Sequence, residues 1–273
     1  MNVTSAGTTV PMTKQREVFI ELEHVSVARG IKTVLHDISL RIHSDEHLAI
    51  LGPNGCGKST LIKTLTCECY PIVAPELRVR IFGRERWELF ELRKHLGIVE
   101  ADLPRRRTLD SIGRDAVISG FFSSSTIWPN TEVSEEMRKR ADEVLEQLDA
   151  AHLAEKRVGE MSAGEMRRVL IGRALVHKPK ILLIDEPSNA LDLAAQYELR
   201  QTLRKLARHD TGIVLITHHL ADIPPEIERV VLMRAGKIIA DGPKSEVLTE
   251  ERLRHLFGVP LTLTQRDGYY HVW

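Results

Sequence analysis

The sequence predicts an α/β fold: a mainly parallel core sheet, an antiparallel β subdomain beside it, and a helical insert. Three observations carry this prediction. An apolar strand at residues 48–51 runs through a glycine-rich loop directly into a helix. Residues 181–184 and 213–216 are uniformly apolar, as is typical of parallel strands that are buried on both faces. Residues 108–160, by contrast, have a mainly helical pattern.

Composition limits the class of protein. A chain of 273 residues can bury a sizeable core as one large α/β domain. Lys and Arg together number 38, and so do Asp and Glu, so no global basic charge favours nucleic acid as a partner. Three cysteines do not suggest a disulfide framework and fit a reducing compartment. No apolar run approaches the roughly 20 residues that span a bilayer, so we expect a cytoplasmic protein.

We expect three segments along the chain. Residues 1–17 are polar and predict a flexible lead. Residues 18–258 predict the main domain, with the helical subdomain inserted at about 103–175. Residues 259–273 predict a C-terminal β-hairpin appendage, because Asp267 and Gly268 lie between alternating apolar residues.

The first part of the chain predicts strands. Residues 18–22 alternate between apolar and polar, residues 25–27 could form a second short strand, and residues 34–42 a third with a bend near Asp37. Residues 77–83 predict another strand after the helix of the glycine-rich loop. Together these strands predict the antiparallel layer beside the parallel core.

The middle of the chain predicts the helical insert. Residues 96–99 predict a strand, and residues 109–118 a single helix. Residues 134–148 predict a strongly periodic helix with Ser134 as its N-cap. The loop between these helices holds three aromatic side chains that fit either local core or a partner-docking face, namely Phe121, Phe122 and Trp128.

One stretch fits the phosphate-binding pattern G-x-x-x-x-G-K-[ST] and has the strand before it and the helix after it that the pattern requires. Its glycines allow backbone N–H groups to turn onto phosphate oxygens, and the helix N-terminus adds partial positive charge. We expect Lys58 to reach the β- and γ-phosphates and the Ser59 hydroxyl to bind Mg²⁺. The predicted nucleotide site consists of Gly52, Pro53, Asn54, Gly55, Cys56, Gly57, Lys58, Ser59 and Thr60.

Two carboxylates follow the apolar run 181–184, at the end of a strand where α/β sheets hold ligands. We expect Asp185 to contact Mg²⁺ through water, and Glu186 to act as general base toward the attacking water. His218 ends the run 213–216 in the same way and could contact the γ-phosphate. Charged residues that merely end a strand in solvent are the alternative, which the phosphate-binding loop upstream disfavours.

With these residues, the chain resembles the nucleotide-binding domain of ABC ATPases over about residues 19–257. Residues 161–165 resemble the family's signature, residues 185–187 its Walker B motif, residues 188–192 its D-loop, and His218 its switch histidine. These motifs occur in the order that the family has. The resemblance therefore implies ATP and Mg²⁺ as cofactors and the hydrolysis of ATP to ADP and phosphate.

The resemblance also implies a dimer. Two such domains pair head to tail, with each ATP between the P-loop of one copy and the signature of the other. Ser162 and Gly164 would then contact the nucleotide of the partner copy, and Asp192 is assigned to the nucleotide site through the D-loop. A homodimer is the simplest expectation. It would work with an integral membrane permease, on the cytoplasmic face of the membrane.

Three departures from the family pattern matter. Arg29 takes the place of the aromatic residue that stacks on adenine, although a guanidinium can also stack on a purine. No Gln follows residues 97–99, so Glu100 or Asp102 could take over its contact with metal or water, or the coupling could be altered. The signature ends in Glu165 instead of Gln, a more common change in the family.

Within the family, residues 81–84 and 223–226 and the missing Gln resemble the molybdate-type branch. This likeness establishes no substrate, because specificity lies in partner subunits. Two functional classes stay open: the ATPase subunit of a membrane transporter, and a soluble ATP-switched factor without a membrane partner. Nucleotide binding without turnover is disfavoured by Glu186 and His218.

Overall fold

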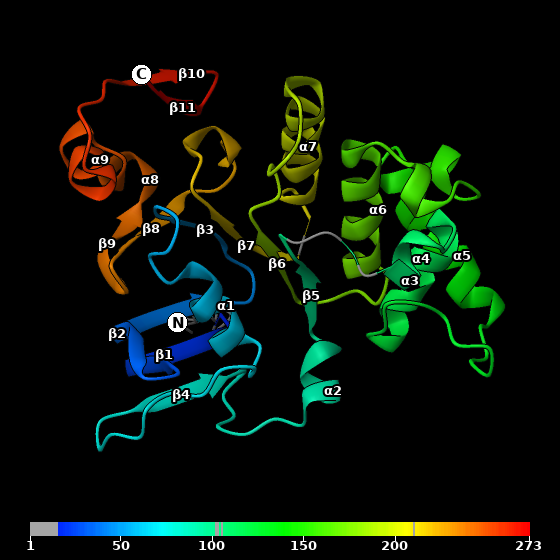
Figure 1. The fold of residues 1–273 in the computed structure, drawn as a ribbon, viewed down its shortest axis with the longest axis horizontal. Helices are drawn as coiled ribbons and strands as arrows, with labels where there is room; N and C mark the ends of the chain where they lie inside the picture. Colours follow the sequence, from blue (N-terminus) through cyan, green and yellow to red (C-terminus); the bar gives the residue numbers. More distant parts are fainter. Residues whose placement is uncertain (1–15, 102–103, 105, 210) are drawn as a thin grey trace, which may run out of the picture.

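The computed structural model describes residues 16–101, 104, 106–209 and 211–273. Within these residues the central sheet has six strands in the order β5-β6-β7-β3-β8-β9, with only the last pair antiparallel. The bounds are β3 His47–Leu51, β5 Leu96–Val99, β6 Ile181–Asp185, β7 Gly212–Thr217, β8 Arg229–Arg234 and β9 Lys237–Pro243. The α/β fold predicted from the sequence is confirmed (Figure 1).

A second, antiparallel sheet has the order β2-β1-β4 and consists of β1 (Val18–Arg29), β2 (Lys32–His43) and β4 (Arg78–Ile81). The separate strand expected at residues 25–27 is wrong, since these residues continue β1 beyond an irregularity at His24. His24 and Asp37 both have positive φ, and the His24 ring nitrogen Nδ1 lies 2.8 Å from the Asp37 carboxylate. The two bends therefore face one another across the β1–β2 pair.

Helices cover the central sheet and form the insert. The helix α1 (Lys58–Leu65) follows the glycine-rich loop, and Figure 1 shows α3 to α6 grouped beyond β5 and β6. Ser134 caps α5 as predicted, because its hydroxyl accepts a hydrogen bond from the Met137 N–H. The remaining bounds are α2 Leu89–Arg93, α3 Arg106–Leu109, α4 Gly113–Ile118, α5 Glu135–Gln147, α6 Ala163–Leu175, α7 Leu193–Leu206, α8 Lys244–Val247 and α9 Glu250–Phe257.

The single helix expected over residues 109–118 is wrong. The chain leaves the helix between α3 and α4, where Ser111 and Gly113 bond to another part of the insert. The Ser111 carbonyl accepts from the Val158 N–H, and the Gly113 N–H donates to the Lys156 carbonyl, each at 2.9 Å. A Cβ at Gly113 would lie 2.2 Å from the Leu153 carbonyl oxygen, so this close approach requires glycine.

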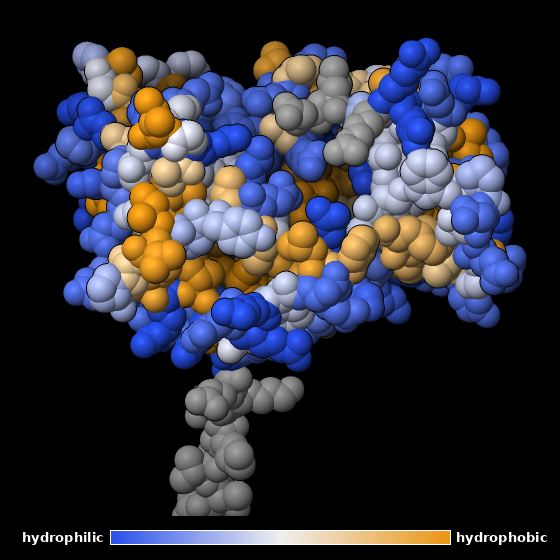
Figure 2. Space-filling model, turned by 60° about the horizontal axis from the view of Figure 1, so that its bottom comes forward, coloured by the Kyte–Doolittle hydropathy of each residue, from blue (hydrophilic) through white to orange (hydrophobic). Residues whose placement is uncertain are grey.

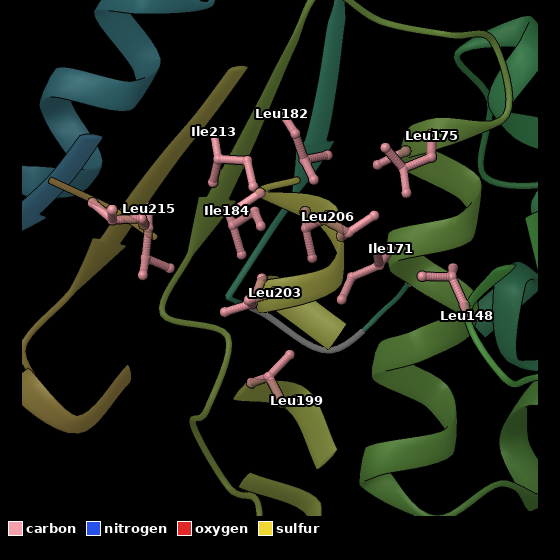
Figure 3. Close-up of a cluster of buried hydrophobic side chains, with 14 of the residues drawn as sticks. Leu148, Ile171, Leu175, Leu182, Ile184, Leu199, Leu203, Leu206, Ile213 and Leu215 are labelled. Carbon is pink, nitrogen blue, oxygen red and sulfur yellow. The ribbon is translucent and has the colours of Figure 1, made fainter. Parts of the chain in front are cut away.

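Side chains of β6 and β7 enter two hydrophobic clusters, because successive residues of a strand face opposite sides of the sheet. Ile184 and Leu215 pack on one side with α6 and α7, as Figure 3 shows. Leu183 and Val214 pack on the other side, with residues of α1 and of the antiparallel sheet. Burial on both faces explains why these strands are uniformly apolar.

The loop aromatics divide between the two roles that the sequence left open. Phe121 and Phe122 are partly buried against the main cluster, which fits local core. Trp128 is 48% exposed, with the Arg107 guanidinium 4.6 Å from its ring centre. Of the three, only the tryptophan is an exposed side chain, and its contact with a partner stays a prediction.

The chain ends in the antiparallel pair β10 (Leu263–Arg266) and β11 (Tyr269–Val272). The Leu263 N–H donates to the Glu250 carboxylate at 2.9 Å, and β11 packs against the short 3₁₀ helix η4 (Leu220–Asp222). Nearly all of the lead expected at residues 1–17 lies outside the described residues. Across the residues that are described, no helix is long and apolar enough to cross a membrane.

Candidate functional site

The glycine-rich loop connects the end of β3 to the start of α1. Gly55 and Gly57 have φ values of 78° and 109°, in the region that favours glycine. A Cβ at Gly52 would lie 2.3 Å from the Met233 carbonyl oxygen of β8. The loop therefore requires glycine for both its dihedral angles and its packing, which is the condition for a backbone cradle around phosphate.

Lys58, the first residue of α1, points back into this loop. Its side chain is 5% exposed, and its ammonium donates to the carbonyls of Gly52 at 2.7 Å and Pro53 at 3.1 Å. The same nitrogen lies 3.1 Å from Oε1 of Glu186. Ser59 beside it is exposed, so its hydroxyl is accessible to a ligand.

Glu186 joins the loop to the neighbouring strand ends. Its N–H donates to the Ile216 carbonyl of β7 at 2.8 Å, and its φ of 45° is uncommon for a residue with a side chain. Its second carboxylate oxygen, Oε2, is hydrogen-bonded to Nδ1 of His218. The fold thus brings Lys58, Glu186 and His218 together from the carboxyl ends of β3, β6 and β7.

Two residues of the predicted site carry oxygen donors that suit Mg²⁺. The Asp185 carboxylate at the end of β6 and the Ser59 hydroxyl are oxygen donors of the kind that Mg²⁺ prefers. No group of three or more His, Cys, Asp or Glu side chains among the described residues could hold a metal alone. Mg²⁺ usually takes one or two protein oxygens and completes its shell with phosphate and water, and its binding by Ser59 and Asp185 stays a prediction.

Arg167 lies on α6, the helix that begins in the signature, and it contacts the end of β5, where the expected Gln is missing. Burial lowers the pKa of the Arg167 guanidinium, and the charge of Asp185 opposes this shift. The guanidinium also donates to the Glu100 carbonyl at 2.8 Å. Glu100 itself is exposed, and Asp102 lies outside the described residues, so a replacement for Gln by either side chain stays a prediction.

The signature starts α6 through a reciprocal capping box. The exposed Ser162 accepts from the Glu165 N–H, and the Glu165 carboxylate accepts from the Ser162 N–H at 2.8 Å. Glu165 also forms an ion pair with Lys156 at 2.9 Å. A Cβ at Gly164 would lie 2.9 Å from the Ala195 Cβ, so Gly164 allows α7 to pack closely. The Glu in place of Gln thus has a local structural role.

We expect Glu165→Gln to lower the free energy of unfolding by about 0.5–1 kcal/mol at pH 7, since it removes a partly exposed ion pair. The Lys156 ammonium and the Ser162 N–H hold the pKa of Glu165 below its ordinary value of 4.5. The stabilisation is therefore present above the unfolded-state pKa and is lost as the pH falls through the folded-state pKa. Urea unfolding at pH 7 and in acid should show the difference shrinking.

Glu143→Gln is the matched control, because its pair with Arg140 is longer, at 3.4 Å, and Glu143 is half exposed. It should change the free energy of unfolding less than Glu165→Gln does. A Glu165→Gln difference that stayed the same at both pH values would contradict the assigned ion pair.

Asp192 and Arg29 are assigned to the nucleotide site only by the family resemblance, and the structure shows the local contacts of each. Asp192 caps α7, where its carboxylate accepts from the Ala195 N–H at 2.8 Å. Arg29 lies at the exposed turn between β1 and β2, paired across the strands with Lys32. A contact of either residue with nucleotide stays a prediction.

A buried carboxylate that the sequence does not predict lies beside the site. One oxygen of Asp222 accepts from the Ser188 hydroxyl at 2.6 Å and from the Thr217 hydroxyl at 2.9 Å. All three residues are buried. Ser188 and Asp222 are 34 positions apart, so no local spacing indicates that they meet.

The fold and this loop define a P-loop nucleotide-binding protein, and residues 35–189 match the family model described as ABC transporter. The uncharacterized ABC transporter ATP-binding protein YlmA of Bacillus subtilis is 31% identical over 247 residues, which cover 89% of this chain and 92% of that protein. The hemin import ATP-binding protein HmuV of Vibrio parahaemolyticus is 33% identical over 258 residues, which cover 91% and 94%.

A solved structure leads to the same family. The ADP conformation of an ATP-binding cassette of an ABC transporter has a TM-score of 0.75 and 26% identity, covering 88% of this chain and 98% of that one. The chain belongs to the ABC transporter ATP-binding family. Its function is that of the ATP-binding component of such a transporter, as the motifs predicted.

Proposed function

We propose that this protein hydrolyses ATP as one half of a dimer and thereby drives a membrane permease. The observation that carries the proposal is the meeting of Lys58, Glu186 and His218 at the ends of three neighbouring parallel strands. A phosphate-binding cradle with a buried carboxylate beside it supports water attack on a terminal phosphate.

Each residue has a role that follows from its contacts. The loop N–H groups and Lys58 hold phosphate oxygens, while Ser59 and Asp185 hold Mg²⁺, which neutralises charge on the phosphates. A phosphate competes with Glu186 for the Lys58 ammonium, which now contacts Oε1. Oε1 then becomes free to accept a proton from water, and the bond from His218 to Oε2 keeps the carboxylate oriented.

We propose a dimer because the phosphate-binding loop and the signature lie apart within one chain, although both are expected to contact the same nucleotide. Figure 1 places α1 beside β1 and β2, and α6 beyond β5. Ser162 is exposed at the N-terminus of α6, where the helix dipole favours an anion. A second copy would bring this end to the γ-phosphate, with Ser162 and Gly164 acting in trans.

A permease partner is supported by apolar surface on one face. Figure 1 has β4 and α2 at the bottom, and Figure 2, which brings that side forward, shows hydrophobic patches around a hollow. Large exposed apolar side chains in the segments near β4 and α2 are Tyr70, Ile72, Val73, Leu89 and Phe90.

The test is an affinity pull-down from membrane and soluble fractions, using Glu186→Gln protein held with ATP and Mg²⁺. We expect a multi-span membrane protein to be recovered. Phe90→Glu should lose it without loss of stability, because Phe90 is 64% exposed. Recovery of only soluble partners, unaffected by Phe90→Glu, would favour the ATP-switched factor.

The same experiment would identify the permease, which sets the specificity for the substrate. The molybdate-type resemblance rests on residues 81–84, at the end of β4, and residues 223–226, after η4. HmuV relatives are named for hemin import. We propose a peripheral position on the cytoplasmic face of the membrane, with an importer-type permease as the partner.

A further inference from the structure

We infer that Asp222 is a positioning residue that ties the segment after Glu186 to the segment that carries His218. This inference rests on the proposed ATP hydrolysis, because it concerns the geometry of the same two catalytic side chains. The carboxylate touches neither of them directly. It acts through the hydroxyls of Ser188, two residues after Glu186, and Thr217, the residue before His218.

The contacts converge on a single oxygen. Asp222 Oδ2 accepts from Ser188 at 2.6 Å and from Thr217 at 2.9 Å, and Asp222 is only 3% exposed. The Thr217 hydroxyl also accepts from the His219 N–H at 3.0 Å. The network therefore reaches the backbone on both sides of His218, and a buried carboxylate with strong donors resists rearrangement.

The backbone around Glu186 needs such support. Its positive φ is maintained only when the surroundings hold it in place. On one side, the Glu186 N–H bonds to Ile216 and the Asn189 N–H to the Glu186 carbonyl. Asp222 also connects Ser188 to Thr217 at the end of β7. The Glu186 carboxylate and the His218 imidazole are therefore held in place relative to one another.

The C-terminal strands hold Asp222 in turn. Asp222 ends η4, against which β11 packs. Gly268 at the turn before β11 lies so close to Pro225 that a Cβ would be 2.8 Å from the proline Cγ. The C-terminal appendage therefore packs against the short helix that ends in Asp222.

Steady-state ATPase assays of Asp222→Ala and Asp222→Asn test the inference. We expect kcat to fall by about 10- to 100-fold in the Ala variant, because displaced catalytic groups cost that much, with KM for ATP changing far less. The Asn variant keeps an acceptor oxygen, so it should recover a large part of kcat. This rescue and the split between kcat and KM are not expected from a general loss of stability.

Ser188→Ala and Thr217→Val each remove one donor and should each reproduce part of the effect if Asp222→Ala fails to fold. Thr202→Val is the matched control, since its buried hydroxyl bonds within α7 to the Glu198 carbonyl at 3.0 Å. It should leave kcat near the wild-type value. Hydrogen exchange provides a second readout, in which Asp222→Ala should speed exchange at Asn189 and His219.

The outcomes separate the inference from the proposed function. Wild-type kcat in folded Asp222→Ala protein would overturn the inference and leave the ATPase proposal standing. Absence of hydrolysis by the wild-type protein with its partners would overturn the ATPase proposal. In that case, faster exchange at Asn189 and His219 would still support the tie, and unchanged exchange would refute it.

Discussion

Glu186→Gln is expected to lower ATP turnover by about 10³-fold, the scale of a lost general base, while ATP binding stays nearly intact. Gln keeps the shape of Glu but cannot take a proton from water. Lys58 still has the Gly52 and Pro53 carbonyls as acceptors, so the loop should keep its conformation. Turnover numbers, ATP affinity and ATP-dependent dimerisation by light scattering measure the three parts of this expectation.

The control for this variant is Glu251→Gln, the same change at an exposed position of α9. It should alter neither turnover nor affinity. Unchanged turnover in Glu186→Gln would assign the base to another group. Loss of ATP binding would instead show that the carboxylate mainly maintains the loop.

Lys58→Met is expected to abolish measurable turnover and to lower the free energy of unfolding by about 3 kcal/mol, because it removes one partner of a buried ion pair. Glu186 would stay 8% exposed, without the ammonium that lies 3.1 Å from its Oε1. The double variant Lys58→Met with Glu186→Gln removes both charges. It should regain most of the lost stability but no activity.

Urea unfolding of the single and double variants gives the coupling energy, and nucleotide titration gives the affinity. Lys63→Met is the matched control, the same substitution in the last turn of α1. It should leave ATP affinity close to that of the wild-type protein. If the double variant were no more stable than Lys58→Met, the Lys58–Glu186 pair would not explain the loss.

The sequence by itself determined the parts of the fold and site that depend on neighbouring residues. Glycine spacing in residues 52–60 predicts the phosphate-binding loop because backbone dihedral angles are a local property. The uniformly apolar residues 181–184 and 213–216 predict central strands because burial on both faces excludes polar side chains. Asp185 and Glu186 come directly after the first of these strands, and His218 comes after the second. Their position at the ends of central strands predicts that they belong to the ligand site.

The tertiary structure alone decided which distant groups meet. It pairs Glu186 with Lys58 and His218, joins Ser188 to Asp222, and brings Lys156 to Glu165 of the capping box. It also broke the helix expected at residues 109–118, because the Ser111 carbonyl and the Gly113 N–H bond to residues 158 and 156. The periodicity of the sequence indicates which face of a helix or strand is buried. It does not indicate which distant residues form hydrogen bonds, because these form only when the fold has brought the partners together.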